Sequence, residues 1–467
     1  MIRERHVSSR EVVTAFLDRI DRLNPRFNAI VSRVDRADAL AEADAADRAV
    51  ARGDRLGPLH GLPQAIKDTA TVRGMRSTFG SPLFADNVPE ADAIFVQRMR
   101  SAGAIFIGKT NVPEFGLGSH TYNPIFGRTG NAWDPTRSAG GSSGGAAVAV
   151  ALRMLPVADG GDMGGSLRNP AAFNNVLGLR PSQGRVPAWP REESFVHTMA
   201  IEGPIGRSAG DLGLLLSVQA GYDPRVPLSI HGGFPDPVGK LGCDLAGRRI
   251  GWLGDLGGRL PFEAGILELC REALSRLGDA GVCIEPLSPP VEWERIWRAF
   301  VVLRQFSLGG GRLGVAYDDP ARRRLMKPEL QWEIEQSRAL SVAQVQRALL
   351  DRTAWLDQVL GLFAHHDYLA LPSAQVFPFP IEWNWPREIA GHPMDSYHRW
   401  MEVVTPGTLS GCPVISLPAG FGPSGLPMGV QVIGRPRDEL SLLQLAHAFE
   451  QVAPWMKQLP PAAANAD

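Results

Sequence analysis

Two serines in glycine-rich stretches and one lysine after an apolar run are residues that can carry out nucleophilic catalysis without histidine. Lys67 follows the apolar run of LPQAIKDTA, Ser142 lies in AGGSSGGAAVAVA, and Ser166 lies in DGGDMGGSLRNPA. Either glycine–serine stretch alone is typical of a turn. Together with Lys67 they fit a known chemistry, because a lysine amine can activate a serine hydroxyl as a nucleophile.

Lysine is scarce in this chain, which makes the position of each lysine informative. Lysines and arginines together number 48, and the lysines are Lys67, Lys109, Lys240, Lys327 and Lys457. Because lysine can lose its proton in a protein and arginine cannot, a lysine within an apolar stretch indicates proton-transfer chemistry that arginine cannot perform. Lys67 and Lys109 meet that description.

Two other motifs match catalytic signatures but lack the context that those signatures need. Gly103–Thr110 reads GAIFIGKT, the phosphate-loop pattern, yet strand-forming residues lie between its glycines, where a bendable loop is required. Lys109 is therefore predicted to be structural. Gly141–Gly145 reads GSSGG, the GxSxG elbow of α/β-hydrolases, yet a polar loop precedes it instead of a buried strand. The elbow serine of an α/β-hydrolase works in a triad with a histidine late in the chain. His447 could be that histidine, but it is expected on a helix surface or in the core.

Composition excludes several classes of protein. The 467 residues are 44% hydrophobic and 21% charged, which is ordinary for a globular protein and argues against disorder. A net charge of -1 provides no electrostatic footprint for nucleic acid. Apolar runs are too short for a membrane span, and the N-terminal sequence has no signal-peptide core. The 4 cysteines are far apart without CxxC spacing, which argues against disulfides or zinc and favours a cytoplasmic protein.

Short apolar runs alternate with helical stretches along the chain, which predicts an α/β fold around a mixed sheet. An amphipathic helix is expected over 8–24, where Ser8 and Glu11 form a capping box. The other expected helices are 36–51, 91–101, 144–153, 262–277, 341–363 and 439–451. The expected strands are 64–66, 104–107, 155–158, 249–253, 282–285, 368–371, 414–417 and 428–433. No obvious linker divides the chain, so residues 1–467 are predicted to form a single domain.

Motifs between Gly61 and Pro187 occur in an order that resembles the amidase signature family of Ser-cisSer-Lys amide hydrolases. They are GLPQAIKD, GKTNVPEFG, GSSGGAAVAVA, DGGDMGGSLRNPA and LGLRPSQGRVP, and stretches near both ends of the chain are also similar. The resemblance implies a large mixed, mostly parallel twisted sheet covered by helices on both faces. The signature core is then about 61–187, and the variable region bordering the substrate is about 255–400. The terminal PPAAANAD predicts a disordered tail over 460–467.

The same resemblance assigns roles to the three polar residues. Lys67 matches the family's lysine base, Ser142 the serine after a cis Gly–Ser peptide bond, and Ser166 the nucleophile that forms an acyl-enzyme. Burial would lower the pKa of Lys67, so that its amine could accept a proton. The Ser142 hydroxyl could pass that proton between Lys67 and Ser166, because it both donates and accepts. No metal or cofactor is required.

Further contacts to the substrate are expected from the loops. The oxyanion hole would consist of the backbone N–H groups of Met163, Gly164, Gly165 and Ser166. Met163 stands where many relatives have a small residue, which changes the pocket wall. Candidate pocket residues are Gly118, His120, Thr121 and Gly141. The Pro-rich stretch 373–400 contains the aromatic residues Phe377, Phe379, Trp383, Trp385, Tyr397 and Trp400. These aromatics either pack on the core or form an aromatic rim, to which Phe377 and Trp383 would belong, that favours aryl or apolar substrates.

The leading functional hypothesis is a free-standing hydrolase of C–N amide bonds in small, largely apolar or aryl substrates. A carbamate (urethane) hydrolase is an alternative with the same triad, because both reactions pass through a similar tetrahedral intermediate. A glutaminase subunit of a tRNA-dependent amidotransferase is a further alternative, which would depend on a partner protein. The expected ligand is a small amide or carbamate, with no nucleic acid or membrane. The sequence leaves open whether the chain forms a homodimer.

Overall fold

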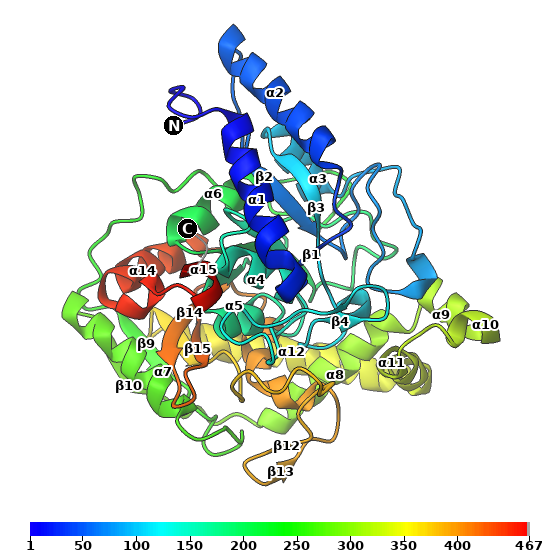
Figure 1. Ribbon diagram of the computed structural model, residues 1–467. Coiled ribbons are helices and arrows are strands. Elements are labelled where there is room, and N and C mark those ends of the chain that lie inside the picture. Colours follow the sequence, from blue (N-terminus) through cyan, green and yellow to red (C-terminus); the bar gives the residue numbers. More distant parts are fainter. Residues whose placement is uncertain (465–467) are drawn as a thin grey trace.

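The computed structural model describes residues 1–464 and is built around an eight-stranded mixed sheet (Figure 1). In spatial order its strands are β10 (Cys283–Pro286), β9 (Arg249–Trp252), β11 (Tyr368–Pro372), β15 (Pro427–Ile433), β14 (Val414–Phe421), β7 (Leu177–Arg180), β8 (Ile201–Gly206) and β6 (Ala158–Asp162). The expected α/β fold with a large mixed sheet is confirmed.

The large sheet is mainly antiparallel, so the expectation of mostly parallel strands is wrong. Within the described chain, the β10–β9 and β9–β11 pairs are parallel and the remaining five neighbouring pairs are antiparallel. One reason is that β14 and β15 form a hairpin, closed by a 2.9 Å hydrogen bond from Gly422 N–H to Leu426 O, and hairpins join antiparallel strands. The other is that β8 lies between β6 and β7 and runs antiparallel to both.

Helices account for most of the regular secondary structure outside this sheet. Those of eight residues or more are α1 (Ser9–Phe27), α2 (Arg36–Arg52), α3 (Ile94–Ser101), α4 (Gly144–Ala151), α6 (Ala209–Gln219), α7 (Ile266–Ser275), α8 (Trp293–Leu308), α9 (Gly311–Asp318), α11 (Pro328–Ala339), α12 (Val342–Phe363) and α14 (Glu439–Val452). Shorter helices are α5 (Arg168–Asn174), α10 (Pro320–Arg323), α13 (Thr405–Ser410) and α15 (Pro461–Ala464).

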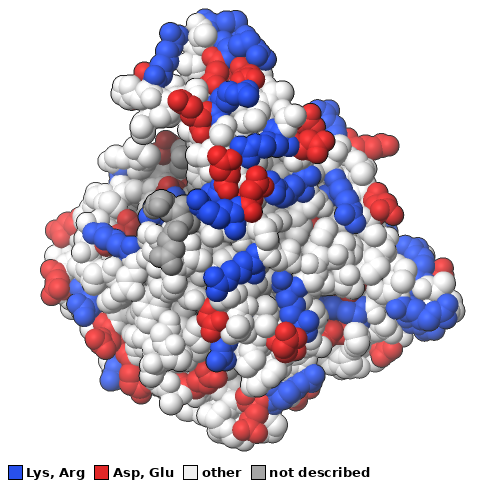
Figure 2. All heavy atoms as spheres, viewed as in Figure 1, with Lys and Arg blue, Asp and Glu red and all other residues white. Residues whose placement is uncertain are grey.

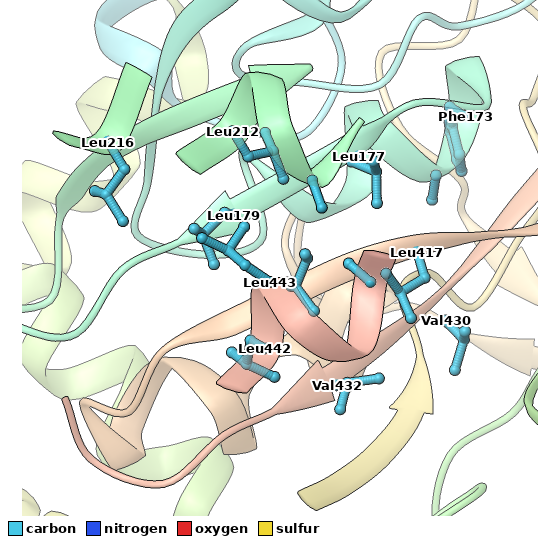
Figure 3. Packing of buried hydrophobic residues seen from close by; sticks show 14 of the residues in the cluster. Phe173, Leu177, Leu179, Leu212, Leu216, Leu417, Val430, Val432, Leu442 and Leu443 are labelled. Carbon is cyan, nitrogen blue, oxygen red and sulfur yellow. The ribbon is translucent and has the colours of Figure 1, made fainter. Parts of the chain in front are cut away.

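Helices cover both faces of the large sheet, as expected. Alternate residues of β11 reveal the two faces, because successive side chains of a strand point to opposite sides. Tyr368 and Ala370 pack in one apolar cluster with residues of α6, α7 and α14. Leu369 and Leu371 pack in a second cluster with residues of α8, α12 and α13. Figure 3 shows the first cluster, in which leucines of α6 and α14 lie among apolar residues of β7, β14 and β15.

A second sheet of three strands positions the first candidate residue. β3 (Ile105–Thr110) lies between β1 (Ile30–Val31), with which it is antiparallel, and β2 (Pro63–Lys67), with which it is parallel. Ile105 and Ile107 of β3 cluster with residues of α1, α2 and α4. Ser8 and Glu11 form the expected capping box at the start of α1. Lys67 is thus the last residue of a fully buried strand.

Opposite charges alternate on the face shown in Figure 2. On α1 and α2, which project at the top of the view, Arg36 contacts Asp18 at 2.5 Å and Asp21 at 3.2 Å, and Arg10 contacts Asp44 at 2.6 Å. Basic and acidic side chains are therefore interspersed over this face. None of the helices in the described chain is long and apolar enough to cross a membrane.

The strand expected over 155–158 begins later than the sequence indicates. Leu155 N–H still donates to Ala149 O of α4 at 3.1 Å, so the chain is only leaving that helix. β6 instead starts at Ala158 and includes two glycines that the sequence pattern assigns to a loop. A Cβ on Gly160 would lie 2.7 Å from the Leu167 side chain, so close packing requires glycine within this strand. The strands β7 and β8 and the helices α6, α8, α9 and α11 lie where no element was expected from the sequence.

The C-terminal segment is ordered further than expected. Pro461–Ala464 form α15, and Ala463 is fully buried. The Ala463 carbonyl accepts a 3.1 Å hydrogen bond from the Arg19 guanidinium on α1. The expectation of a disordered tail from 460 is therefore wrong for these four residues, and residues 465–467 of that predicted tail lie outside the described chain.

Candidate active site

Lys67 is buried at the end of β2, with 3% of its surface exposed. Its Nζ donates to Ser142 Oγ at 2.8 Å and to the Gly161 carbonyl at 3.1 Å. Its backbone N–H donates to the Asp159 carboxylate at 3.2 Å. These contacts join the three-stranded sheet to β6 of the large sheet and fix the amine beside Ser142.

Burial sets the protonation of Lys67. Desolvation disfavours the ammonium and lowers the Lys67 pKa to about 8, against the opposing charges of Glu202, Asp159 and Asp162. Burial also raises the pKa of Asp159 to about 7. The Lys67 amine is therefore neutral in a substantial fraction of molecules near pH 8, as a proton acceptor must be.

Ser142 follows a cis Gly141–Ser142 peptide bond, the feature that the family resemblance implied. Side chains of the preceding loop hold this segment: Ser119 Oγ donates to Gly141 O at 2.5 Å, and Thr121 Oγ1 donates to Gly140 O at 2.8 Å. A Cβ at position 141 would lie 2.9 Å from the backbone nitrogen of His120, so the close approach of these two backbone segments requires glycine.

Ser166 lies in the loop between β6 and α5 and is 6% exposed. The Asp162 carboxylate organises this loop by accepting the N–H groups of Gly165 at 3.0 Å and Leu167 at 3.1 Å. Arg168 in turn donates two hydrogen bonds to Asp162, at 3.0 and 2.9 Å. The two positively charged arginines Arg168 and Arg180 hold the pKa of the Asp162 carboxyl well below its usual range. A buried carboxylate thus fixes the turn that presents Ser166.

Lys67, Ser142 and Ser166 line one cavity of about 180 Å³. The structure therefore brings together three residues that lie far apart in the sequence. Other wall residues come from the loop at Phe115–Gly118, from Gly161–Gly164 and from Ala200–Glu202 at the start of β8. Thr69, Arg304, Leu308 and Met401 also line the cavity. A Cβ on Gly116 would lie 3.2 Å from Ser142 Oγ, so that loop also approaches the site closely.

Three of the four expected oxyanion donors are free, and one is already used. Within the described chain, the backbone N–H groups of Met163, Gly164 and Ser166 make no hydrogen bond, whereas that of Gly165 donates to Asp162. Gly165 has φ +90°, and a Cβ there would lie 2.0 Å from Asn169 Oδ1. Gly165 therefore shapes the turn, and its N–H departs from the expected role.

The expected substrate contacts divide into one that lines the cavity and others that do not. Gly118 lines it. His120 is buried and uses both ring nitrogens, on Ile381 O at 3.0 Å and Ser138 Oγ at 2.8 Å, and burial lowers its pKa to about 4. Thr121 and Gly141 belong to the packing of the Ser142 loop. These residues support the site from behind.

The aromatic stretch 373–400 packs mainly on the core, so the expectation that Phe377 and Trp383 rim the cavity is wrong. Phe377 is 9% exposed and lies against Gly422, where a Cβ would contact its ring at 2.4 Å. Trp383 is 51% exposed and stacks on Phe379 with 6.4 Å between ring centroids. Phe377, Phe379 and Trp400 of this stretch belong to the apolar cluster that also contains residues of β7, β14 and β15.

A different aromatic cluster borders the site. A larger cavity of about 610 Å³ shares Phe115, Met163, Ala200 and Leu308 with the first. Its apolar wall includes Phe79 and Phe84, whose rings lie 5.3 Å apart and each contact Phe115. We call this larger space the outer cavity.

The positions of GAIFIGKT and GSSGG in the fold show that neither is the catalytic motif it resembles. Lys109 is fully buried in β3, and its Nζ donates to Ala70 O at 2.5 Å and Ser77 Oγ at 3.0 Å. Ile105–Thr110 is a strand with no phosphate loop. His447 is on α14 with its ring 3.7 Å from Glu450, and it does not line the cavity. Lys109 is thus structural, and no histidine in the described chain completes a triad at GSSGG.

Sequence reasoning missed a buried polar network beside the cavity. Arg304 Nε donates to Glu333 Oε1 at 2.7 Å, Arg304 Nη2 donates to Tyr397 OH at 2.7 Å, and Tyr397 OH donates to Glu333 Oε1 at 2.5 Å. The three residues come from α8, α11 and the aromatic stretch. One arginine in a chain rich in arginine, at an ordinary helix position, provides no signal in the sequence, and Tyr397 was singled out only as an aromatic residue.

Comparison with known proteins agrees with this geometry. The family model described as Amidase matches residues 11–443. The chain is 36% identical to the A-type subunit of the glutamyl-tRNA(Gln) amidotransferase of Moorella thermoacetica, covering 98% of this chain and 96% of that protein. It is 34% identical to an acylamidase of Rhodococcus erythropolis, covering 97% and 94%. The crystal structure of a bacterial aryl acylamidase of the amidase signature family superimposes with a TM-score of 0.91 at 29% identity, covering 100% and 96%.

The fold and the matched length define a hydrolase that acts on carbon–nitrogen bonds. The chain belongs to the amidase signature family.

Proposed function

We propose that this protein is a free-standing amidase whose nucleophile is Ser166, with Ser142 and Lys67 as its proton relay. The observation that carries the proposal is the 2.8 Å contact between Lys67 Nζ and Ser142 Oγ, at a cavity that Ser166 also lines. A neutral amine beside a hydroxyl is the arrangement that activates serine without histidine.

In the first half-reaction Ser166 Oγ attacks the amide carbonyl. Its proton passes to Ser142 Oγ, while the Ser142 proton passes to Lys67 Nζ. The carbonyl π electrons move to oxygen, and the N–H groups of Met163, Gly164 and Ser166 stabilise that oxyanion. Collapse of the tetrahedral intermediate breaks the C–N bond, and the leaving amine takes the proton back from Lys67 through Ser142.

In the second half-reaction water attacks the acyl-enzyme by the same route. The relay removes a proton from water, and collapse of the second intermediate returns a proton to Ser166 Oγ and releases the carboxylic acid. The relay ends each cycle in its starting protonation state. Neither half-reaction, as written, uses a metal or an organic cofactor.

The substrate class that fits the site is a small amide with an apolar or aryl part. The cavity that Ser166 lines, of about 180 Å³, holds little more than the reacting groups. The outer cavity offers the rings of Phe79, Phe84 and Phe115 to the rest of the substrate. Aromatic walls favour aromatic and aliphatic surfaces. The free state of all four cysteines fits the reducing cytoplasm that we propose for this enzyme.

Carbamate hydrolysis would use the same steps, since a urethane carbonyl passes through a similar tetrahedral intermediate. The glutaminase reaction of an amidotransferase is the other candidate, which the 36% identity to one component of such an enzyme favours. A glutaminase component would release ammonia from glutamine only when its partner is added, whereas the proposed enzyme acts alone.

The test is release of nitroaniline from a simple nitroanilide and from a matching N-nitrophenyl carbamate, by wild type and Ser166→Ala. We expect release by wild type that disappears in the variant, and the ratio of the two rates ranks amide against carbamate. Release that persists in Ser166→Ala would refute the assignment of the nucleophile. No release from either substrate, with ammonia formed from glutamine on addition of a partner, would favour the glutaminase.

A further inference from the structure

Arg304 is a buried charge on the wall of the proposed reaction cavity. It belongs to α8, is 3% exposed, and lines the same cavity as Lys67, Ser142 and Ser166. A guanidinium has five N–H donors and no acceptor, and burying one is costly unless each nitrogen finds a partner. The hydrogen-bond partners of its three nitrogens therefore indicate whether any donor remains for a substrate.

Two of the three nitrogens are held by strong partners away from the substrate. Nε donates to the Glu333 carboxylate and Nη2 to Tyr397 OH, each at 2.7 Å, and Tyr397 also donates to Glu333. Glu333 is fully buried, and the Arg304 guanidinium is rigid and planar. These contacts fix the orientation of the guanidinium, and so the direction in which its third nitrogen points.

The third nitrogen has only a weak acceptor. Arg304 Nη1 lies 3.3 Å from Met163 Sδ, and a thioether sulfur accepts hydrogen bonds poorly. Met163 lines the cavity and immediately precedes Gly164, one of the proposed oxyanion donors. Its unbranched side chain can rotate aside to let a better acceptor approach. A fixed, incompletely satisfied donor thus faces the cavity next to the reacting centre.

We propose that Arg304 determines substrate specificity by donating, through Nη1, to an oxygen acceptor of the substrate other than the scissile carbonyl. This inference rests on the proposed amidase function and narrows its substrates to amides that carry a second carbonyl or carboxylate oxygen near the scissile bond. Glu333 balances the Arg304 charge, so both a neutral carbonyl and a carboxylate suit the donor. Glu202 also lines the cavity, and burial raises its pKa, which reduces its repulsion of an anionic group.

Three nitroanilides of similar size test the proposal: butanoyl, 4-oxopentanoyl and 3-carboxypropanoyl 4-nitroanilide. The first has no second oxygen, the second a neutral ketone, and the third a carboxylate. We expect wild type to show a kcat/KM about tenfold to a hundredfold higher for at least one oxygen-bearing substrate than for the butanoyl compound, since a hydrogen bond from a charged donor is worth that factor. Preference for the carboxylate alone identifies an anionic substrate, and preference for both identifies the carbonyl oxygen.

The test variant is the double substitution Arg304→Gln and Glu333→Gln, which removes both members of the buried ion pair. The control is Arg295→Gln, the same arginine-to-glutamine change at an outer position of α8. The double variant is expected to reduce the ratio of kcat/KM values to about one, and Arg295→Gln to leave it as in wild type. A ratio that survives in the double variant would overturn the proposal. An equal loss for all three substrates would do so too, because it would mean that Arg304 only supports the fold.

A binding measurement keeps the two proposals apart and covers a double variant that fails to fold. Calorimetric titration of Ser166→Ala compares succinamate and 4-oxopentanamide with butanamide, which lacks the second oxygen. We expect one of the oxygen-bearing ligands to bind at least tenfold more tightly, even if no nitroanilide is hydrolysed and the proposed function fails. Equal affinity for all three ligands would overturn the role of Arg304.

Discussion

The two sides of the reaction cavity are built in different ways. One side is formed by segments of the signature core, where glycines bring backbones together and place Lys67, Ser142 and Ser166. The other side is formed by Arg304 and Leu308 of α8 and by Met401, which lies at a kink in the short 3-10 segment Arg399–Val404 after the aromatic stretch. The first side, which we call the core side, contains the groups that we propose cleave the bond. The second, the helical side, contains side chains that we expect to contact the rest of the substrate.

This difference separates chemistry from selectivity. Substitutions on the core side should lower kcat for every substrate, because they remove groups that act on the scissile bond itself. Substitutions on the helical side should change KM and the ranking of substrates, because they remove contacts that differ from one substrate to another. The expected effects below are ordered by size and test that separation.

Ser166→Ala should lower kcat by at least ~10⁴-fold for all substrates, because no other hydroxyl can form the acyl-enzyme. Nitroaniline release under saturating substrate measures the loss. Circular dichroism and thermal unfolding should match wild type, since the Asp162 contacts that hold the turn go to the N–H groups of Gly165 and Leu167 and not to the Ser166 side chain. Residual activity within tenfold of wild type would remove Ser166 from the mechanism.

Lys67→Ala should lower kcat by about 10²–10⁴-fold, the usual contribution of a general base. Lys67→Arg should be no better, because arginine stays protonated and cannot accept the Ser142 proton. Steady-state kinetics on the same nitroanilide provide the comparison. Recovery of activity in the arginine variant would mean that Lys67 acts by its charge and not as a base.

Asp162→Asn should lower kcat about a hundredfold and also destabilise the protein. The variant weakens the acceptor that holds the Gly165 and Leu167 N–H groups, and it leaves Arg168 and Arg180 buried without their anion. Thermal unfolding and kinetics measured on one preparation show both effects. Full activity in a folded variant would show that the Ser166 turn does not need this carboxylate.

Leu308→Ala should raise KM several-fold for aryl amides with little change in kcat, since Leu308 lines both cavities and the proposed apolar part of the substrate lies there. Trp383→Ala is the matched control from the aromatic stretch, and its KM should stay within twofold of wild type because Trp383 lines neither cavity. A larger effect in Trp383→Ala than in Leu308→Ala would restore the aromatic rim that the sequence suggested.

The pH profile should show the smallest effect of the series. The proposed base is neutral Lys67, whose pKa is about 8, so kcat/KM should rise with pH and reach half its plateau near that pH. The negative charge of Asp159 raises the Lys67 pKa, so Asp159→Asn should move this midpoint to lower pH. The variant amide can still accept the Lys67 N–H. A midpoint that moves to higher pH would contradict the assignment of the base.

The sequence predicted the core side of the cavity far better than the helical side. Glycine and serine spacing is a local property, so the loops of Ser142 and Ser166 could be located in the sequence, and the family resemblance implied the cis Gly141–Ser142 bond. Lys67 was found because lysine is scarce and this one follows an apolar run. Arg304 and Leu308 lie on an amphipathic helix, and their placement at the cavity depends on how α8 packs against α12 and the sheet.

Two errors about the fold have the same origin. Strand direction in the large sheet depends on β8 lying between β6 and β7, which no local pattern encodes. Composition left two alternatives open for the aromatic stretch, and the rim was expected to include Phe377 and Trp383, but Phe377 fills core space against Gly422. Local chemistry was therefore predictable, whereas contacts between distant segments required the structure.

The central claim is that Ser166 is the nucleophile activated through Ser142 and Lys67. Labelling with a fluorophosphonate, followed by peptide mapping by mass spectrometry, tests it most directly because the probe bonds to the activated serine. We expect the adduct on Ser166 in wild type, no adduct in Ser166→Ala, and slow labelling in Lys67→Ala. An adduct on Ser142 or Ser143, or equal labelling of wild type and Ser166→Ala, would contradict the account.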